Sequence, residues 1–198
     1  MKQYGLAPVL RRAGVTVALC LLALAAAASP ASMSGNTTSG VSIKNFGKVS
    51  DRYYRGSQPT EAQVAELKKL GIKTVIDLRK DNVPQEAEWV RSQGMQYFNI
   101  PLKASVAATD EQTSYFLGLV NNPANWPVYV HCKGGRHRTG ALTAVYRITQ
   151  DGWTADQAFK EMKEYEFDSG LFGGPMAQKK FVYSYYERHA KATPSSQR

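Results

Sequence analysis

The segment 126–150 constrains the fold most, because an apolar run, a glycine-containing loop and an amphipathic stretch follow one another there. The run 126–130 predicts a buried strand, and 140–150 predicts a helix. A loop that joins a strand end to a helix start directs its backbone N–H groups at one point, at the positive end of the helix dipole. The sequence therefore predicts an anion-binding loop at 131–140.

The side chains of this loop suit phosphoryl transfer. Cys132 stands near its start and Arg138 near its far end, with five residues between them. A thiol surrounded by N–H groups has a lowered pKa and reacts as the thiolate. A guanidinium offers a planar pair of N–H groups that matches two phosphate oxygens. We therefore expect Cys132 to be the nucleophile of a cysteinyl-phosphate mechanism and Arg138 to bind the phosphoryl group. His131 is expected to orient the loop through hydrogen bonds.

The pattern His-Cys-x5-Arg-Thr-Gly resembles the signature of cysteine-dependent protein tyrosine and dual-specificity phosphatases. The segments 53–59, 75–79 and 99–102 resemble the compact bacterial and fungal members, and the resemblance extends over about 49–189. It implies that Thr139 assists breakdown of the phosphoenzyme. The expected substrate-binding residues are the remaining members of the loop: Lys133, Gly134, Gly135, Arg136, His137 and Gly140.

The general acid is the weak point of the pattern. Resembling phosphatases carry an aspartate in the loop at 101–110, about where this chain has Ser105. Asp110 is the only acid of that loop and is our candidate, although Thr109 and Asp110 also predict a helix start. Asp168 is a second candidate from another loop. A leaving group such as the phosphate of a pyrophosphate needs little protonation.

The substrate class stays open between two kinds of phosphate ester. The predicted activity is hydrolysis of phosphomonoesters of the phosphotyrosine or dual-specificity type. Lys133, Arg136 and His137 add positive charge, which favours substrates with several phosphates. The loop also resembles those of fungal and plant phosphatases of inositol pyrophosphates, and its start resembles phosphoinositide 3-phosphatases. The alternative is therefore a phosphoinositide or inositol polyphosphate and pyrophosphate phosphatase.

Proteins of other classes fit the loop less well. A phosphate-binding pseudophosphatase would keep the pocket and lose turnover, and the missing acid at Ser105 keeps this alternative open. A rhodanese-type sulfurtransferase has a shorter loop, and an arsenate reductase normally uses resolving cysteines. We expect no cofactor and no metal.

The N-terminus predicts an export signal. Lys2, Arg11 and Arg12 precede an apolar stretch at 15–28 and a run of small residues, as in a bacterial secretory signal peptide over 1–31. Its removal would take Cys20 away and leave Cys132 without a disulfide partner. The expectation is an exported protein, periplasmic or secreted, with no stable membrane span after cleavage; an uncleaved anchor is the alternative.

The rest of the chain predicts one α/β domain. Residues 32–48 are expected to form a flexible leader, 49–190 the phosphatase domain and 191–198 a disordered tail. Strands expected at 74–78, 95–100 and 128–130 alternate with helices, which favours a central, mostly parallel sheet of about four to five strands flanked by helices. The formal net charge of +9 favours anionic partners, namely a phosphorylated protein, small molecule or lipid headgroup. Nothing resembles a nucleic-acid module, and we expect a monomer.

Overall fold

A computed structural model describes Met1 and residues 40–168 and 176–192 of the 198-residue chain. Apart from Met1, the signal peptide predicted at 1–31 lies outside the described residues, and so do residues 32–39 of the predicted leader and 193–198 of the predicted tail. The described part of the chain after residue 40 belongs to one compact unit. Within the described residues, no helix has both the length and the apolar character needed to cross a membrane.

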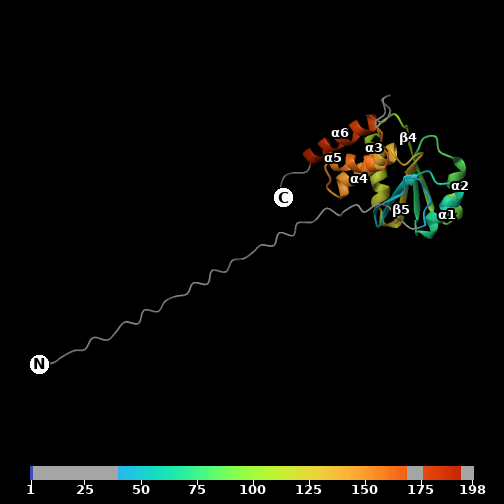
Figure 1. Cartoon of the computed structure of the whole chain (residues 1–198), viewed down its shortest axis with the longest axis horizontal. Coiled ribbons are helices and arrows are strands. Elements are labelled where there is room, and N and C mark those ends of the chain that lie inside the picture. The colour runs from blue at the N-terminus through green and yellow to red at the C-terminus, as the bar shows by residue number, and fades with distance from the viewer. Residues whose placement is uncertain (2–39, 169–175, 193–198) are drawn as a thin grey trace. The chain divides into compact units, whose positions relative to one another are not determined.

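The sheet has five strands in the order β1-β2-β5-β3-β4 (Figure 1). Four are parallel to one another: β2 (Tyr53–Ser57), β5 (Val128–Cys132), β3 (Thr74–Arg79) and β4 (Gln96–Leu102). The short strand β1 (Gly47–Ser50) pairs antiparallel with β2. The predicted mostly parallel α/β sheet is therefore confirmed.

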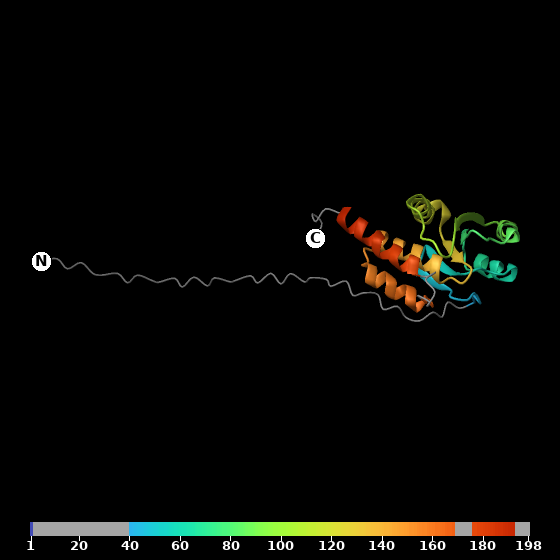
Figure 2. The ribbon, with the colours of Figure 1, turned by 90° about the horizontal axis from the view of Figure 1, so that it is seen from above.

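Helices cover both faces of this sheet. Figures 1 and 2 show α1 (Glu61–Lys69) and α2 (Pro84–Ser92) on one side. The other side carries α3 (Asp110–Asn121), α4 (His137–Gln150), α5 (Ala155–Glu164) and α6 (Met176–Ala192), and a short 3-10 helix, η1 (Pro123–Asn125), precedes β5. Capping boxes start three of these helices: α1 at Thr60, α3 at Thr109 and α5 at Thr154.

Strand β5 lies at the centre and contributes to both hydrophobic clusters. Val128, Val130 and Cys132 pack into the cluster on the α4 side, whereas Tyr129 belongs to the cluster under α1 and α2. This division follows from the two-residue period of a strand, which sends alternate side chains to opposite faces. Because both faces are covered, β5 reads as a continuous apolar run, as the sequence analysis assumed.

The packed region begins before residue 49, where the sequence predicts the start of the domain. Ile43 and Phe46 are buried, and the ring of Phe46 stacks with those of Tyr54 and Tyr129 at centroid distances of 5.9 and 6.0 Å. Burial of these apolar side chains over β2 and β5 explains why residues ahead of β1 join the core. Two isolated apolar residues in a polar segment gave only a weak sequence signal.

Candidate active site

The loop between β5 and α4 brings its two chemically important side chains together. Cys132 is the last residue of β5, and α4 starts at His137 rather than at the predicted residue 140. Arg138 and Thr139 therefore lie in the first turn of the helix. Arg136 occupies the N-cap position, and its side chain makes no capping hydrogen bond. The N–H groups of a first turn without a side-chain cap can bind an anion.

The environment of Cys132 favours the thiolate. The residue is only 3% exposed, and burial by itself would raise the pKa of its thiol. The hydroxyl and backbone N–H of Thr139, the charge of Arg138 and the N–H of Gly134 favour the thiolate and outweigh that effect. The pKa of Cys132 is therefore lowered, as the sequence analysis expected for a thiol in this kind of loop.

Two neighbouring hollows open over the loop. The first, of about 270 Å³, is lined by Ala104, Cys132, Lys133, Gly134, Arg136, His137 and Arg138. The second, of about 540 Å³, shares Ala104, Lys133 and Arg138 with the first. It extends over Lys80, Asp81, Leu102, Lys103 and Ser105. Most side chains predicted to bind substrate thus line the first hollow, and further cations surround the second.

The guanidinium of Arg138 is anchored by the ends of β3 and β4. It is buried, its Nη1 donates to the carbonyl of Leu102 at 3.1 Å, and the same atom lies 3.5 Å from Oδ1 of Asp81. Asp81 also forms an ion pair with Arg79, in which Oδ2 of Asp81 lies 3.6 Å from Nη2 of Arg79. Sequence reasoning missed Asp81. The available signal was its position just after a strand that ends at the same sheet edge as Cys132.

Beneath the loop, His131 contacts two buried acids. Its Nε2 lies 2.6 Å from Oε1 of Glu86, its Nδ1 lies 3.9 Å from Oδ1 of Asp77, and all three side chains are fully buried. Burial lowers the pKa of His131, but the contact with Glu86, the charge of Asp77 and the Cys132 thiolate raise it more, so the net shift is upward. Neither acid was predicted to belong to the site.

These three residues are the one cluster among the described residues whose donor set could hold a cation. The remaining oxygens of the two acids already have protein partners. Gln58 donates to Oε2 of Glu86 at 3.0 Å, and Tyr97 donates to Oδ2 of Asp77 at 3.0 Å. Direct pairing within the protein therefore accounts for the burial of the cluster.

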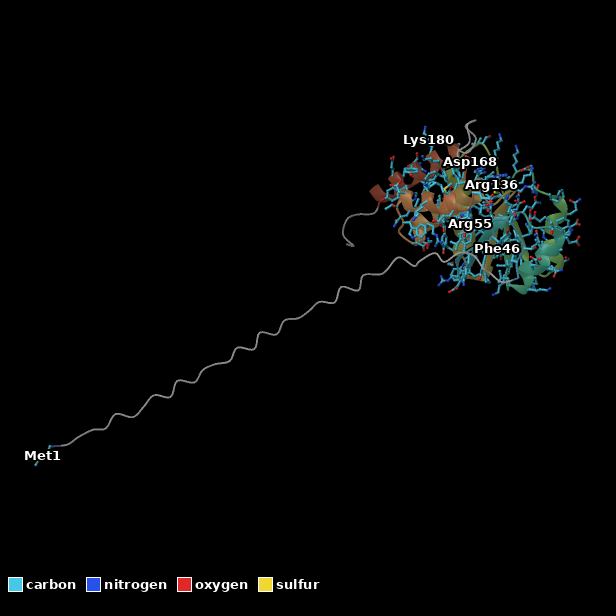
Figure 3. All side chains as sticks on the ribbon, viewed as in Figure 1. Met1, Phe46, Arg55, Arg136, Asp168 and Lys180 are labelled. Atoms are coloured by element: carbon cyan, nitrogen blue, oxygen red, sulfur yellow. The ribbon has the colours of Figure 1, made fainter. Side chains whose placement is uncertain are left out.

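Residues from other segments hold the loop backbone. Nη2 of Arg55, on β2, donates to the carbonyl of Gly135 at 2.7 Å, and the amide of Asn45 donates to the carbonyl of Gly134 at 2.9 Å. Arg55 is fully buried and stacks over the ring of Tyr165 at 3.8 Å. Figure 3 labels Arg55 on β2 and Arg136 in the loop, together with Asp168.

The two acids proposed from sequence have different surroundings. Asp110 lines neither hollow; its carboxylate is 79% exposed and pairs with Arg188 of α6 at 3.2 Å. Because Asp110 is the first residue of α3 behind the Thr109 cap, its side chain belongs to the helix start. Asp168 lies near His137 of the loop. Burial and the charge of Arg136 lower the pKa of the His137 imidazole, and Asp168 opposes this shift without cancelling it.

A family model described as "DSP-PTPase phosphatase fused to NAD+ Kinase" matches residues 36–183, which include the loop and every strand. The chain belongs to this DSP-PTPase family. The resemblance stated from the sequence is therefore confirmed.

Relatives of the DSP-PTPase chain include bacterial and fungal phosphatases. The chain is 32% identical over 123 residues to the dual specificity protein phosphatase TpbA of Pseudomonas aeruginosa. The matched segment covers 62% of this chain and 55% of TpbA. It is 28% identical over 130 residues to the inositol diphosphatase SIW14 of Saccharomyces cerevisiae, covering 63% of this chain and 46% of SIW14. The chain thus spans about half the length of these relatives.

Solved structures share the fold. The core catalytic domain of SIW14 superposes with a TM-score of 0.66 at 26% identity, covering 78% of this chain and 93% of that one. TpbA gives a TM-score of 0.61 at 28% identity, covering 75% and 92%. A cysteine-to-serine variant of TpbA, solved in complex with phosphotyrosine, gives 0.61 at 28% identity and covers 74% and 90%. The architecture expected for a dual-specificity phosphatase is confirmed.

Proposed function

We propose that this DSP-PTPase domain hydrolyses phosphomonoesters through a cysteinyl-phosphate intermediate. The observation that carries this proposal is the placement of Cys132, with a lowered thiol pKa, against the first turn of α4, which also holds Arg138. That arrangement combines a nucleophile, N–H donors and a guanidinium at one hollow. Relatives of this chain include a protein named as a dual specificity protein phosphatase and one named as an inositol diphosphatase.

The reaction proceeds in two displacements at phosphorus. Sγ of Cys132 attacks the phosphorus, the bond to the ester oxygen breaks, and that oxygen leaves with the electron pair and a proton. Water then attacks the phosphocysteine, the P–S bond breaks, and its electron pair returns to sulfur as phosphate departs. Arg138 and the loop N–H groups stabilise the charge on the nonbridging oxygens. The Thr139 hydroxyl, which favours the thiolate of Cys132, also favours sulfur as the leaving group in the second step.

Phosphate release from 4-nitrophenyl phosphate in the presence of EDTA tests this proposal. We expect turnover by the wild-type protein, none by Cys132→Ser, and a loss of about 10²–10³ in kcat for Arg138→Lys. Acid quenching followed by peptide mass analysis should find phosphate on Cys132. Activity that survives Cys132→Ser contradicts the mechanism. A protein that binds phosphotyrosine but releases no phosphate from any ester is the pseudophosphatase instead.

A substrate with several phosphates is the second candidate, favoured by the hollow beside the loop. Lys80, Lys103 and Lys133 line this hollow next to Arg138 and offer positive charge for a second phosphate. The experiment compares kcat/KM for an inositol pyrophosphate and for a phosphotyrosine peptide. If the first candidate class is right, Lys80→Gln with Lys103→Gln leaves the peptide reaction unchanged and the pyrophosphate is the poorer substrate.

Export and assembly are separate proposals. We propose that residues 1–31 form a cleaved signal peptide, that the mature protein is periplasmic or secreted, and that it is a monomer. The basic n-region, the apolar stretch and the small residues after it support export. N-terminal sequencing of the protein recovered from the periplasm and light scattering of the purified protein test these points.

A further inference from the structure

We propose that Asp81 is the general acid that protonates the leaving oxygen. This assignment rests on the proposed phosphatase activity. Asp81 comes from the segment after β3, not from the loop at 101–110, which supplies no carboxylate to either hollow. Among the residues that line the two hollows, Asp81 is the one acid.

The position of Asp81 is set by the guanidinium that binds the phosphoryl group. Oδ1 of Asp81 lies 3.5 Å from Nη1 of Arg138, which is itself held at 3.1 Å from the carbonyl of Leu102. Arg79 is 6% exposed and donates to the backbone carbonyl of Asp81 as well as contacting its carboxylate. The backbone of Asp81 is therefore held by the buried Arg79, while its carboxylate is 69% exposed and lines the hollow.

The charges around Asp81 change when substrate binds. Without bound substrate, the pKa of Asp81 is lowered by a hydrogen bond between its carboxylate and its own backbone N–H and by the charges of Arg79 and Arg138. Lys80, Lys103 and Lys133 line the same hollow. A bound phosphate dianion engages Arg138 and places negative charge beside the carboxylate, and both effects favour the protonated acid. The exposed carboxyl takes up this proton from water.

The protons and electrons then balance over the two steps. As Sγ of Cys132 attacks phosphorus, the P–O bond breaks and its electron pair stays on the leaving oxygen, which receives the proton of Asp81. Asp81 is left as a carboxylate. In the second step the carboxylate takes a proton from the attacking water as the P–S bond breaks, and Cys132 returns to the thiolate.

The dependence on the leaving group distinguishes an acid from a residue that only orients Arg138. Phenyl phosphate has a poor leaving group and 4-nitrophenyl phosphate a good one. For Asp81→Asn we expect kcat/KM with phenyl phosphate to fall by about 10²–10⁴, and with 4-nitrophenyl phosphate by roughly tenfold or less. The basic limb of the pH profile should disappear with phenyl phosphate, and Asp81→Glu should restore part of the rate.

Matched variants make each outcome decisive. Asp51→Asn, an exposed aspartate paired with Lys48 at the turn between β1 and β2, should behave as wild type with both substrates. Equal losses with both substrates for Asp81→Asn would make Asp81 a positioning residue and overturn the assignment. The leaving-group-dependent loss in Asp110→Asn or Asp168→Asn instead would also overturn it. A wild-type protein that hydrolyses neither ester would overturn the proposed function and this assignment with it.

Discussion

Oε1 of Glu86 lies 2.6 Å from Nε2 of His131, and neither side chain is exposed to solvent. The contact joins the first turn of α2 to the residue that precedes Cys132, the proposed nucleophile. A buried ion pair is costly to break because the remaining partner keeps its charge without compensation. The position of the phosphate-binding loop therefore depends on a carboxylate from the opposite face of the sheet.

Glu86→Gln should destabilise the fold. We expect the free energy of unfolding to fall by roughly 3 kcal/mol, the lower end for a broken buried pair, because the amide can still accept a hydrogen bond from His131. Urea unfolding followed by circular dichroism measures the change. Glu88→Gln, an exposed position on the same helix, is the matched control and should cost little. Equal stability of the two variants would contradict this role of Glu86.

The same pair predicts a pH dependence of stability. Since the pKa of His131 is raised above 6.5 in the folded protein, its protonated form contributes stability that is fully present below that value. This contribution is lost as pH rises through the folded pKa. As pH rises from 6.5 through the folded pKa of His131, the free energy of unfolding of the wild type should therefore fall relative to that of Glu86→Gln. The contribution of Asp77 is the same in both proteins and does not affect the difference. Unfolding series at several pH values test this, and parallel curves would refute it.

Two glycines with the same backbone conformation should respond differently to alanine. Gly135 and Gly152 have φ values of +68° and +67°. A Cβ at Gly135 would lie 2.5 Å from the carbonyl carbon of Gly56, whereas nothing lies within 4 Å of a Cβ at Gly152. We expect Gly152→Ala to cost about 1–2 kcal/mol with activity retained, and Gly135→Ala to lose phosphatase activity. Activity assays and thermal unfolding of both variants check this, and an active Gly135→Ala would contradict the close packing.

The thiol of Cys132 should ionise at a lower pH than an ordinary cysteine thiol. The rate of its alkylation by iodoacetamide, measured against pH, reports its pKa. Because the hydroxyl of Thr139 lowers the pKa of the Cys132 thiol, Thr139→Ala should move this profile to higher pH. Thr149→Ala, at the other end of α4 and bonded to carbonyls of its own helix, should leave it in place. Identical profiles for wild type and Thr139→Ala would contradict the hydroxyl's effect.

Local patterns in the sequence were sufficient to predict most helices and strands and the candidate nucleophile, Cys132. The capping boxes at Thr60 and Thr154 and the strand–loop–helix segment around Cys132 involve residues close together in the chain. Hydrophobic periodicity and capping act over a few residues, so they can be read directly. The start of α4 was misjudged because the loop residues from His137 onward already adopt helical geometry.

The surroundings of the loop depended on contacts that are distant in sequence. Asp81, Glu86 and Arg55 reach the loop only because β2, β3 and β5 are neighbours in the sheet. Asp110, expected near the site from its position in a loop, instead pairs with Arg188 of α6.

The candidate nucleophile, the guanidinium and their spacing follow from the sequence alone, because one short loop holds them and its geometry is set locally. Only the tertiary structure decided which acids meet that loop, because strand order and helix packing determine which distant side chains share a small volume. The cluster of His131 with Glu86 and the contact of Arg138 with Asp81 are the two places where that packing completes the site.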